Sequence, residues 1–254
     1  MVLESYLRRR LEEKDILIMT HLVMGYPSFE ECFETVRSTV KAGMDLMELQ
    51  IPFSEPIADG PVILRACHRA LKKGATVERC LNFAGEVANA FDIPFLIMSY
   101  YNIFFTYGID GFASALAGRN LKGAIVPDLP LEEGGDYLEA MRDHGLAPVP
   151  IFSPTTPDER MRHIASLASG FIYCVSRKGI TGSKTTFSEE TEIYLERCRQ
   201  ATHLPLAVGF GVKEKGDMDF LKGKTEIAVI GTRMIGIMES HGAEGVGDFL
   251  RSLR

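Results

Sequence analysis

The 254-residue sequence contains no run of the ~18 apolar residues that a membrane-spanning helix needs. It also has no surplus of basic residues, since 28 Lys and Arg face 34 Asp and Glu, for a formal net charge of -6. Without a basic surface, nucleic acid and anionic membranes are poor candidates as partners. A small phosphorylated ligand is still allowed, because a few backbone N–H groups suffice to hold it.

Cysteine and histidine are both sparse, and neither follows a ligand spacing. The five cysteines are odd in number, show no C-x-x-C pair, and lie at Cys32, Cys67, Cys80, Cys174 and Cys198. This usage predicts reduced, buried thiols in a cytoplasmic protein. The six histidines lack an H-x-x-x-H or H-E-x-x-H spacing, so the sequence predicts no metal site.

The first residues predict a surface helix over about residues 2–13. Leu3, Leu7 and Leu11 are four apart among charged residues. A signal peptide would instead place an apolar core after a basic start, so we expect no secretory signal here.

Short apolar runs alternate with longer helical patterns along the whole chain. The expected helices cover 29–43, 130–145, 157–170 and the C-terminal 244–254, with glycine at several of the ends. The expected strands are nearly continuous in hydrophobicity, as strands buried on both faces are, and cover 16–23, 46–50, 94–100, 122–128, 147–152, 170–176, 205–210 and 226–232.

Eight such strands with intervening helices predict a single α/β domain over 1–254, a closed (β/α)8 barrel of the TIM type with one extra N-terminal helix. The alternative is an open doubly wound sheet. That fold would favour G-x-G-x-x-G after the first strand, where this chain has M-G-Y-P. In the barrel, chemistry sits where the strands end.

Two carboxylates stand out near the end of the second expected strand. Glu48 lies between Met47 and Leu49, and Asp59 follows in the loop sequence A-D-G-P. Carboxylates are rarely buried without a partner or a purpose, and such a pair could do acid–base work. The alternatives are a structural charge pair for Glu48 and a turn-capping role for Asp59.

Glycine-rich ends on the last three strands predict a phosphate site. Gly179 and Gly182 follow the sixth strand, G-F-G with Gly211 follows the seventh, and Gly231 with Thr232 begins a helix after the eighth. Tyr100, Tyr173 and Phe210 lie at or near strand ends and would form a flat apolar pocket if they all point inward. Ordinary turns and core aromatics are the alternative reading.

The stretch M-E-L-Q-I-P-F-S-E-P-I-A-D-G, residues 47–60, closely resembles the signature of tryptophan synthase alpha subunits. M-G-Y-P, S-Y-Y-N-I-F-F-T-Y-G-I-D-G-F, I-V-P-D-L-P, S-R-K-G-I-T-G, G-F-G and G-T then follow in the family's order along the chain. The resemblance implies retro-aldol cleavage of indole-3-glycerol phosphate to indole and glyceraldehyde 3-phosphate, the penultimate step of tryptophan biosynthesis.

The same resemblance implies roles for individual residues. Glu48 matches the acid–base catalyst, and Asp59 matches the carboxylate that accepts the indole N–H. The remaining matches are the site wall at Tyr173, the indole pocket at Tyr100 and Phe210, the phosphate cup at Gly182, Gly211, Gly231 and Thr232, and the mobile loop at Thr181 and Arg177, where Thr181 holds Asp59 on closure.

The resemblance further implies a tryptophan synthase beta subunit as partner, in an α2β2 complex, with docking positions near Asn102 and Asp128. It implies no cofactor in this chain, with pyridoxal phosphate carried only by the beta partner. Rival functions are another sugar-phosphate barrel enzyme and a catalytically weak allosteric partner of the beta subunit. The intact pair of Glu48 and Asp59 favours a working lyase.

Four positions depart from the family pattern. Gln50 replaces a glycine two residues after Glu48, on the same strand face, where it would narrow the site or bond Glu48. We expect that departure to be incidental to catalysis. His21 and Val23 stand where relatives often have an aromatic residue and a threonine, and Tyr26 replaces an acidic residue often seen after the first strand.

Overall fold

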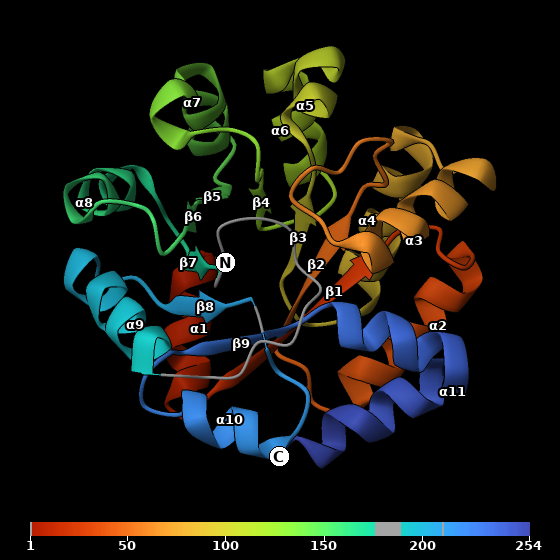
Figure 1. Ribbon diagram of the computed structural model, residues 1–254. Coiled ribbons are helices and arrows are strands. Elements are labelled where there is room, and N and C mark those ends of the chain that lie inside the picture. Colours follow the sequence, from red (N-terminus) through yellow and green to blue (C-terminus); the bar gives the residue numbers. More distant parts are fainter. Residues whose placement is uncertain (1, 176–188, 210) are drawn as a thin grey trace.

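The computed structural model describes residues 2–175, 189–209 and 211–254. Within them, parallel strands form a ring that is surrounded by helices (Figure 1). The strands are β1 (Leu17–Val23), β2 (Leu46–Gln50), β3 (Phe95–Met98), β4 (Gly123–Ile125), β5 (Ala147–Val149), β6 (Ile151–Phe152), β7 (Ile172–Cys174), β8 (Leu206–Val208) and β9 (Ile227–Ile230).

The hydrogen-bonded order of the strands is β5-β4-β3-β2-β1-β9-β8-β7-β6, and every pair is parallel. The two end strands, β5 and β6, are consecutive in the chain and separated only by Pro150. The ring is therefore nearly closed, and the predicted barrel is confirmed.

The single strand expected over 147–152 is wrong in detail, because the structure divides it into β5 and β6. Pro150 has no N–H to donate, so the ladder is interrupted at this residue. Its carbonyl still accepts from the backbone N–H of Tyr173 at 2.9 Å. The other strands begin and end within a few residues of their expected bounds.

The helices that follow the strands are α2 (Phe29–Lys41), α3 (Pro61–Lys72), α4 (Val77–Ala90), α5 (Tyr101–Tyr107), α6 (Ile109–Ala117), α7 (Gly135–Asp143), α8 (Asp158–Leu167), α9 (Glu189–Ala201), α10 (Lys215–Leu221) and α11 (Thr232–Ser252). The helix expected over 130–145 is shorter than predicted. A 3-10 turn, η1 (Leu131–Glu133), precedes α7, because Gly134 and Gly135 weaken helix propagation between them.

The barrel has two apolar layers. The inner layer fills the ring with alternate residues of the strands, including Leu17, Met19, Leu46, Leu96 and Val229. The outer layer joins the opposite strand faces to the helices. Along β1 and β2, the buried polar side chains of His21, Glu48 and Gln50 follow the apolar Met19 and Leu46, so these polar groups lie toward the end where the two strands finish.

The N-terminal segment forms α1 (Leu3–Leu11), whose Leu3, Tyr6 and Leu7 pack against the inner layer. The buried carboxylate of Asp45 holds this region, since it contacts Arg10 Nη2 at 3.1 Å and Lys14 Nζ at 2.5 Å. It thereby links the end of α1 to the start of β2. Among the described residues, no helix has the length and apolar character needed to cross a membrane.

Candidate active site

Glu48 and His21 face each other near the ends of β2 and β1. The parallel register of the two strands places them opposite one another. His21 Nδ1 lies 2.9 Å from Glu48 Oε1, and both residues are almost fully buried. Glu48 therefore has a titratable partner inside the barrel, as a buried carboxylate requires.

Tyr173 approaches the same carboxylate from across the barrel. It lies on β7, and its hydroxyl donates to Glu48 Oε1 at 3.4 Å. The ring passes so close to β8 that a Cβ on Gly209 would lie only 2.2 Å from it. Gly209 is therefore required for Tyr173 to reach Glu48.

Asp59 lies in the loop between β2 and α3 and is held by two donors. The side-chain amide of Gln50 donates to Asp59 Oδ2 at 2.8 Å, and the hydroxyl of Tyr100 donates to the same oxygen at 2.9 Å. Tyr100 is fixed in turn by the backbone N–H of Ala58 at 3.0 Å and by stacking on Phe53, with 5.1 Å between ring centroids.

The electrostatics of the two carboxylates are linked through His21. Burial raises the pKa of Asp59, against the lowering effects of the His21 charge and of the hydrogen bonds from Gln50 and Tyr100. Burial acts to lower the pKa of His21, but hydrogen bonding and charge from Glu48, with a smaller effect of Asp59, raise it above its ordinary value.

The two tyrosines remain hydrogen-bond donors over the physiological range. Burial, reinforced by Glu48, raises the pKa of Tyr173 well above its ordinary value. Burial and the charge of Asp59 do the same for Tyr100. Each carboxylate therefore has a phenol beside it that stays protonated.

The predicted phosphate cup is described in part. Gly231 directly precedes α11, and Thr232 is the first residue of that helix, whose first turn contains no acidic side chain. Gly211 has φ +83°, a conformation that side chains other than glycine rarely adopt. Gly182, Thr181, Arg177 and Phe210 lie outside the described residues.

The structure thus brings together four of the residues singled out in the sequence, which are Glu48, Asp59, Tyr100 and Tyr173. It assigns Gln50 a partner different from the one considered, since its amide bonds Asp59 and not Glu48. His21, Phe53 and Gly209 were not foreseen as site residues. His21 could have been found by aligning β1 with β2, because a histidine in an apolar strand then faces Glu48.

The other departures lie apart from the carboxylates. The hydroxyl of Tyr26 bonds Glu239 and accepts from Arg69 at 2.9 Å, which joins the loop after β1 to α3 and α11. Val23 is buried at the end of β1, in register with Gln50.

The expected docking positions lie at the same end of the barrel. Asn102 is exposed on α5, and Asp128 accepts from the backbone N–H of Tyr101 at 2.8 Å, so it fixes the start of that helix.

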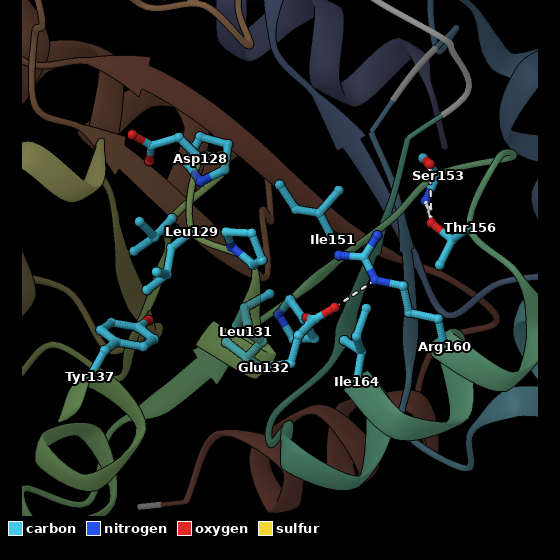
Figure 2. Close-up of a pocket in the computed structure, with 15 residues that line it drawn as sticks. Asp128, Leu129, Leu131, Glu132, Tyr137, Ile151, Ser153, Thr156, Arg160 and Ile164 are labelled. Carbon is cyan, nitrogen blue, oxygen red and sulfur yellow. Dashed lines mark hydrogen bonds and ion pairs between the residues drawn. The ribbon is translucent and has the colours of Figure 1, made fainter. Parts of the chain in front are cut away.

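Asp128 also borders a cavity of about 260 Å³ between the segments that follow β4 and β6. Figure 2 shows Glu132 paired with Arg160 on one side of it and Leu129 with Tyr137 on another. Neither Glu48 nor Asp59 lines this cavity.

Within the described parts of the chain, no three His, Cys, Asp or Glu side chains are grouped so that they could hold a metal ion. The five cysteines are all buried and unpaired.

The chain is similar over nearly its full length to known proteins. Residues 7–249 match the family model described as tryptophan synthase alpha chain. The tryptophan synthase alpha chain of Desulforapulum autotrophicum is 60% identical over 252 residues, which cover 99% of this chain and 100% of that protein.

Solved structures of tryptophan synthases are also similar to this chain. A chain of Mycobacterium tuberculosis tryptophan synthase superposes with a TM-score of 0.92 at 25% identity, covering 99% of this chain and 96% of that one. A chain of the Pyrococcus furiosus tryptophan synthase a2b2 complex gives a TM-score of 0.87 at 28% identity, covering 94% and 97%. The resemblance found in the motifs is confirmed, and the chain belongs to the tryptophan synthase alpha chain family.

Proposed function

We propose that Glu48 and Asp59 together carry the cleavage of indole-3-glycerol phosphate, the lyase reaction of this family. The observation that supports this assignment is the placement of two buried or partly buried carboxylates at one end of the barrel, each beside a protonated phenol. A carboxylate that only stabilised the fold would not require a second carboxylate at the same end of the barrel.

The reaction is a retro-aldol cleavage, and its proton balance suits this pair. A proton is added at indole C3, and a proton is removed from the glycerol hydroxyl. The C3–C1′ bond then breaks, its electron pair returns to the indole ring, and the hydroxyl carbon becomes the aldehyde of glyceraldehyde 3-phosphate. Glu48 supplies the first proton and accepts the second.

Asp59 acts at the other end of the ring. Protonation at C3 places positive charge on the ring nitrogen, and a carboxylate that accepts the N–H stabilises that charge. Gln50 and Tyr100 both donate to Oδ2 of Asp59, and Oδ1 accepts no hydrogen bond from the described residues. The free oxygen suits a substrate N–H.

The phosphate end of the substrate would lie at the start of α11. Gly211, Gly231 and Thr232, with Gly182 of the segment after β7, would offer backbone N–H groups and a hydroxyl. We assign Tyr100, Tyr173 and Phe210 to the aromatic pocket, and Arg177 and Thr181 to a loop that closes over it.

We further propose that the chain works without a cofactor and pairs with a tryptophan synthase beta subunit, which would carry the pyridoxal phosphate of an α2β2 complex. Among the solved relatives is a tryptophan synthase a2b2 complex. Exposed apolar side chains near Asn102 provide a surface for it, since Ile57 is 72% exposed and Phe105 is 69% exposed. Five unpaired thiols favour a cytoplasmic location.

The direct test is release of indole from indole-3-glycerol phosphate by the purified chain. We expect formation of indole and glyceraldehyde 3-phosphate in equal amounts, faster when the beta subunit is added. A folded chain that binds the beta subunit and stimulates it, yet releases no indole with or without it, would instead be an allosteric partner.

A further inference from the structure

The carboxylate of Asp59 determines how the side-chain amide of Gln50 is oriented. A carboxylate only accepts hydrogen bonds, so the NH2 group of Gln50 must face Asp59 Oδ2. Its carbonyl oxygen Oε1 then points the other way. That oxygen is buried and has no hydrogen-bond partner among the residues that the structure describes.

His21 also has a buried polar atom without a hydrogen-bond partner among the described residues. Its Nδ1 is engaged with Glu48 at 2.9 Å, while its Nε2 is buried and also lacks a partner within the described part of the chain. The two unpartnered atoms belong to diagonal neighbours, because His21 is opposite Glu48, and Gln50 is two residues further along β2 on the same face. Buried polar atoms are rarely left unpaired, so a donor on Nε2 facing the acceptor Oε1 would satisfy both.

Only one protonation state of His21 supplies that donor while keeping the bond to an ionised Glu48. The imidazolium has N–H groups on both ring nitrogens, whereas neutral imidazole has one. We propose that His21, held as an imidazolium between Glu48 and Gln50, is a positioning residue that links the two carboxylates in one chain, Glu48–His21–Gln50–Asp59.

In the reaction, this link would stabilise the charge that forms on Glu48. That effect rests on the proposed role of Glu48 as the acid–base group. When Glu48 gives its proton to indole C3, it becomes a buried carboxylate, and His21 balances that charge without occupying Oε2. Gln50 simultaneously fixes Asp59. The titratable groups around His21 are Glu48 on β2, Asp59 in the following loop and, across Glu48, Tyr173 on β7. The raised pKa of His21 agrees with this arrangement.

The first test compares His21→Phe with His21→Asn in indole release. Phenylalanine keeps a ring but loses both nitrogens, and we expect kcat to fall about tenfold to a hundredfold, the effect of losing a hydrogen bond to a charged group. KM should change little. The basic limb of the kcat–pH profile should move to higher pH, because Glu48 starts the reaction protonated and a buried carboxyl group without a neighbouring cation gives up its proton less readily. Asparagine places an amide N–H near the position of Nδ1 and should recover part of kcat while leaving the limb displaced.

The second test asks whether His21 and Gln50 act as one unit. If they do, His21→Phe combined with Gln50→Gly should lower kcat no further than the more damaging single change. Fully additive losses of kcat would overturn the proposed hydrogen-bonded series. A His21→Phe variant with the kcat and pH profile of the wild type would also overturn it, as would a His21→Asn variant no more active than His21→Phe.

A third measurement needs no turnover and so separates this proposal from the role of Glu48 in catalysis. In ¹⁵N NMR of the histidine side chains, His21 should titrate above its ordinary value of 6.5 in the wild-type chain and lower in Glu48→Gln. The same spectra show whether each variant is folded. Titration of His21 at or below the ordinary value in both proteins would overturn the proposal even if Glu48→Gln is inactive.

Discussion

The side-chain amide of Gln50 donates to Asp59 at 2.8 Å, at a position where the family signature has a glycine without any side chain. The second donor to Asp59 is the hydroxyl of Tyr100. In this chain, therefore, part of the orientation of a proposed catalytic carboxylate comes from a side chain of β2 itself.

Replacing Gln50 should consequently lower activity, contrary to the expectation from sequence that the departure is incidental. Gln50→Gly removes one of two donors to Asp59, and we expect kcat/KM to fall about tenfold, as for loss of one hydrogen bond to a charged group. Gln50→Leu is the matched control for side-chain volume and should lose as much. If the leucine variant is as active as the wild type while the glycine variant is not, Gln50 only fills space.

Glu48→Gln should abolish most turnover and leave the fold intact. Glutamine keeps a hydrogen-bonding side chain beside His21 and Tyr173 but cannot carry a proton between the hydroxyl and C3. Loss of a general acid–base group typically costs ~10² to 10⁴-fold in rate. Stopped assays of indole release should be paired with a thermal melt. Activity within about threefold of wild type would remove Glu48 from the mechanism.

Asp59→Asn should lose activity but gain stability at neutral pH. The pKa of Asp59 is raised on folding, so the folded chain holds this proton more tightly than the unfolded chain. Its contribution to stability is present below the ordinary carboxyl pKa and lost as pH rises through the raised one. The asparagine is not charged at any pH, so we expect a melting temperature a few degrees above wild type at pH 7.

The comparison must include acidic pH. There the wild-type carboxyl is protonated, and the advantage of Asp59→Asn should shrink. Steady-state kinetics on the same preparations should show a loss mainly in kcat. An unchanged kcat with weaker substrate affinity would move Asp59 to a binding role.

Gly211→Ala should weaken binding of the phosphate end of the substrate. The residue has φ +83°, which costs an L-residue about 1–2 kcal/mol unless the backbone shifts and moves its N–H groups. Gly223 is a matched control, since it has φ +76° and open space around it, in the exposed turn after α10. We expect KM and the inhibition constant for glycerol phosphate to rise roughly tenfold for Gly211→Ala only. Equal effects at both positions would mean that only general stability is affected.

The barrel was predictable from sequence because each strand carries its own apolar pattern and glycine or proline marks the adjoining turns. The division of 147–152 was predictable in principle, since Pro150 cannot donate a ladder hydrogen bond. Glu48 and Asp59 stood out because carboxylates are unusual beside a buried strand. The partnership of His21 with Glu48 depends on the register of β1 against β2, and the need for Gly209 depends on the ring of Tyr173 across the barrel. Such contacts arise only after the strands are assembled.

The beta subunit should bind where apolar side chains are exposed beside the proposed active site. Ile57 lies next to Ala58, whose N–H donates to Tyr100, and Tyr100 directly precedes α5, which carries Phe105. The two exposed side chains are thus on neighbouring segments. Each is more than two-thirds exposed, at 72% and 69%, and burying them in an interface would be favourable.

Ile57→Asp and Phe105→Asp should therefore weaken binding of the beta subunit and reduce its stimulation of indole release, while leaving the rate of the isolated chain nearly unchanged. Ile193→Asp is the control, because Ile193 is 52% exposed but lies on α9, beside β7 and β8. A partner acting through this surface changes the lyase by coupling between two sites, so affinity and stimulation should fall together. Titration of each variant with the beta subunit, followed by calorimetry and by indole release, measures both. If Ile193→Asp weakens the complex and the other two do not, the partner binds a different face of the barrel.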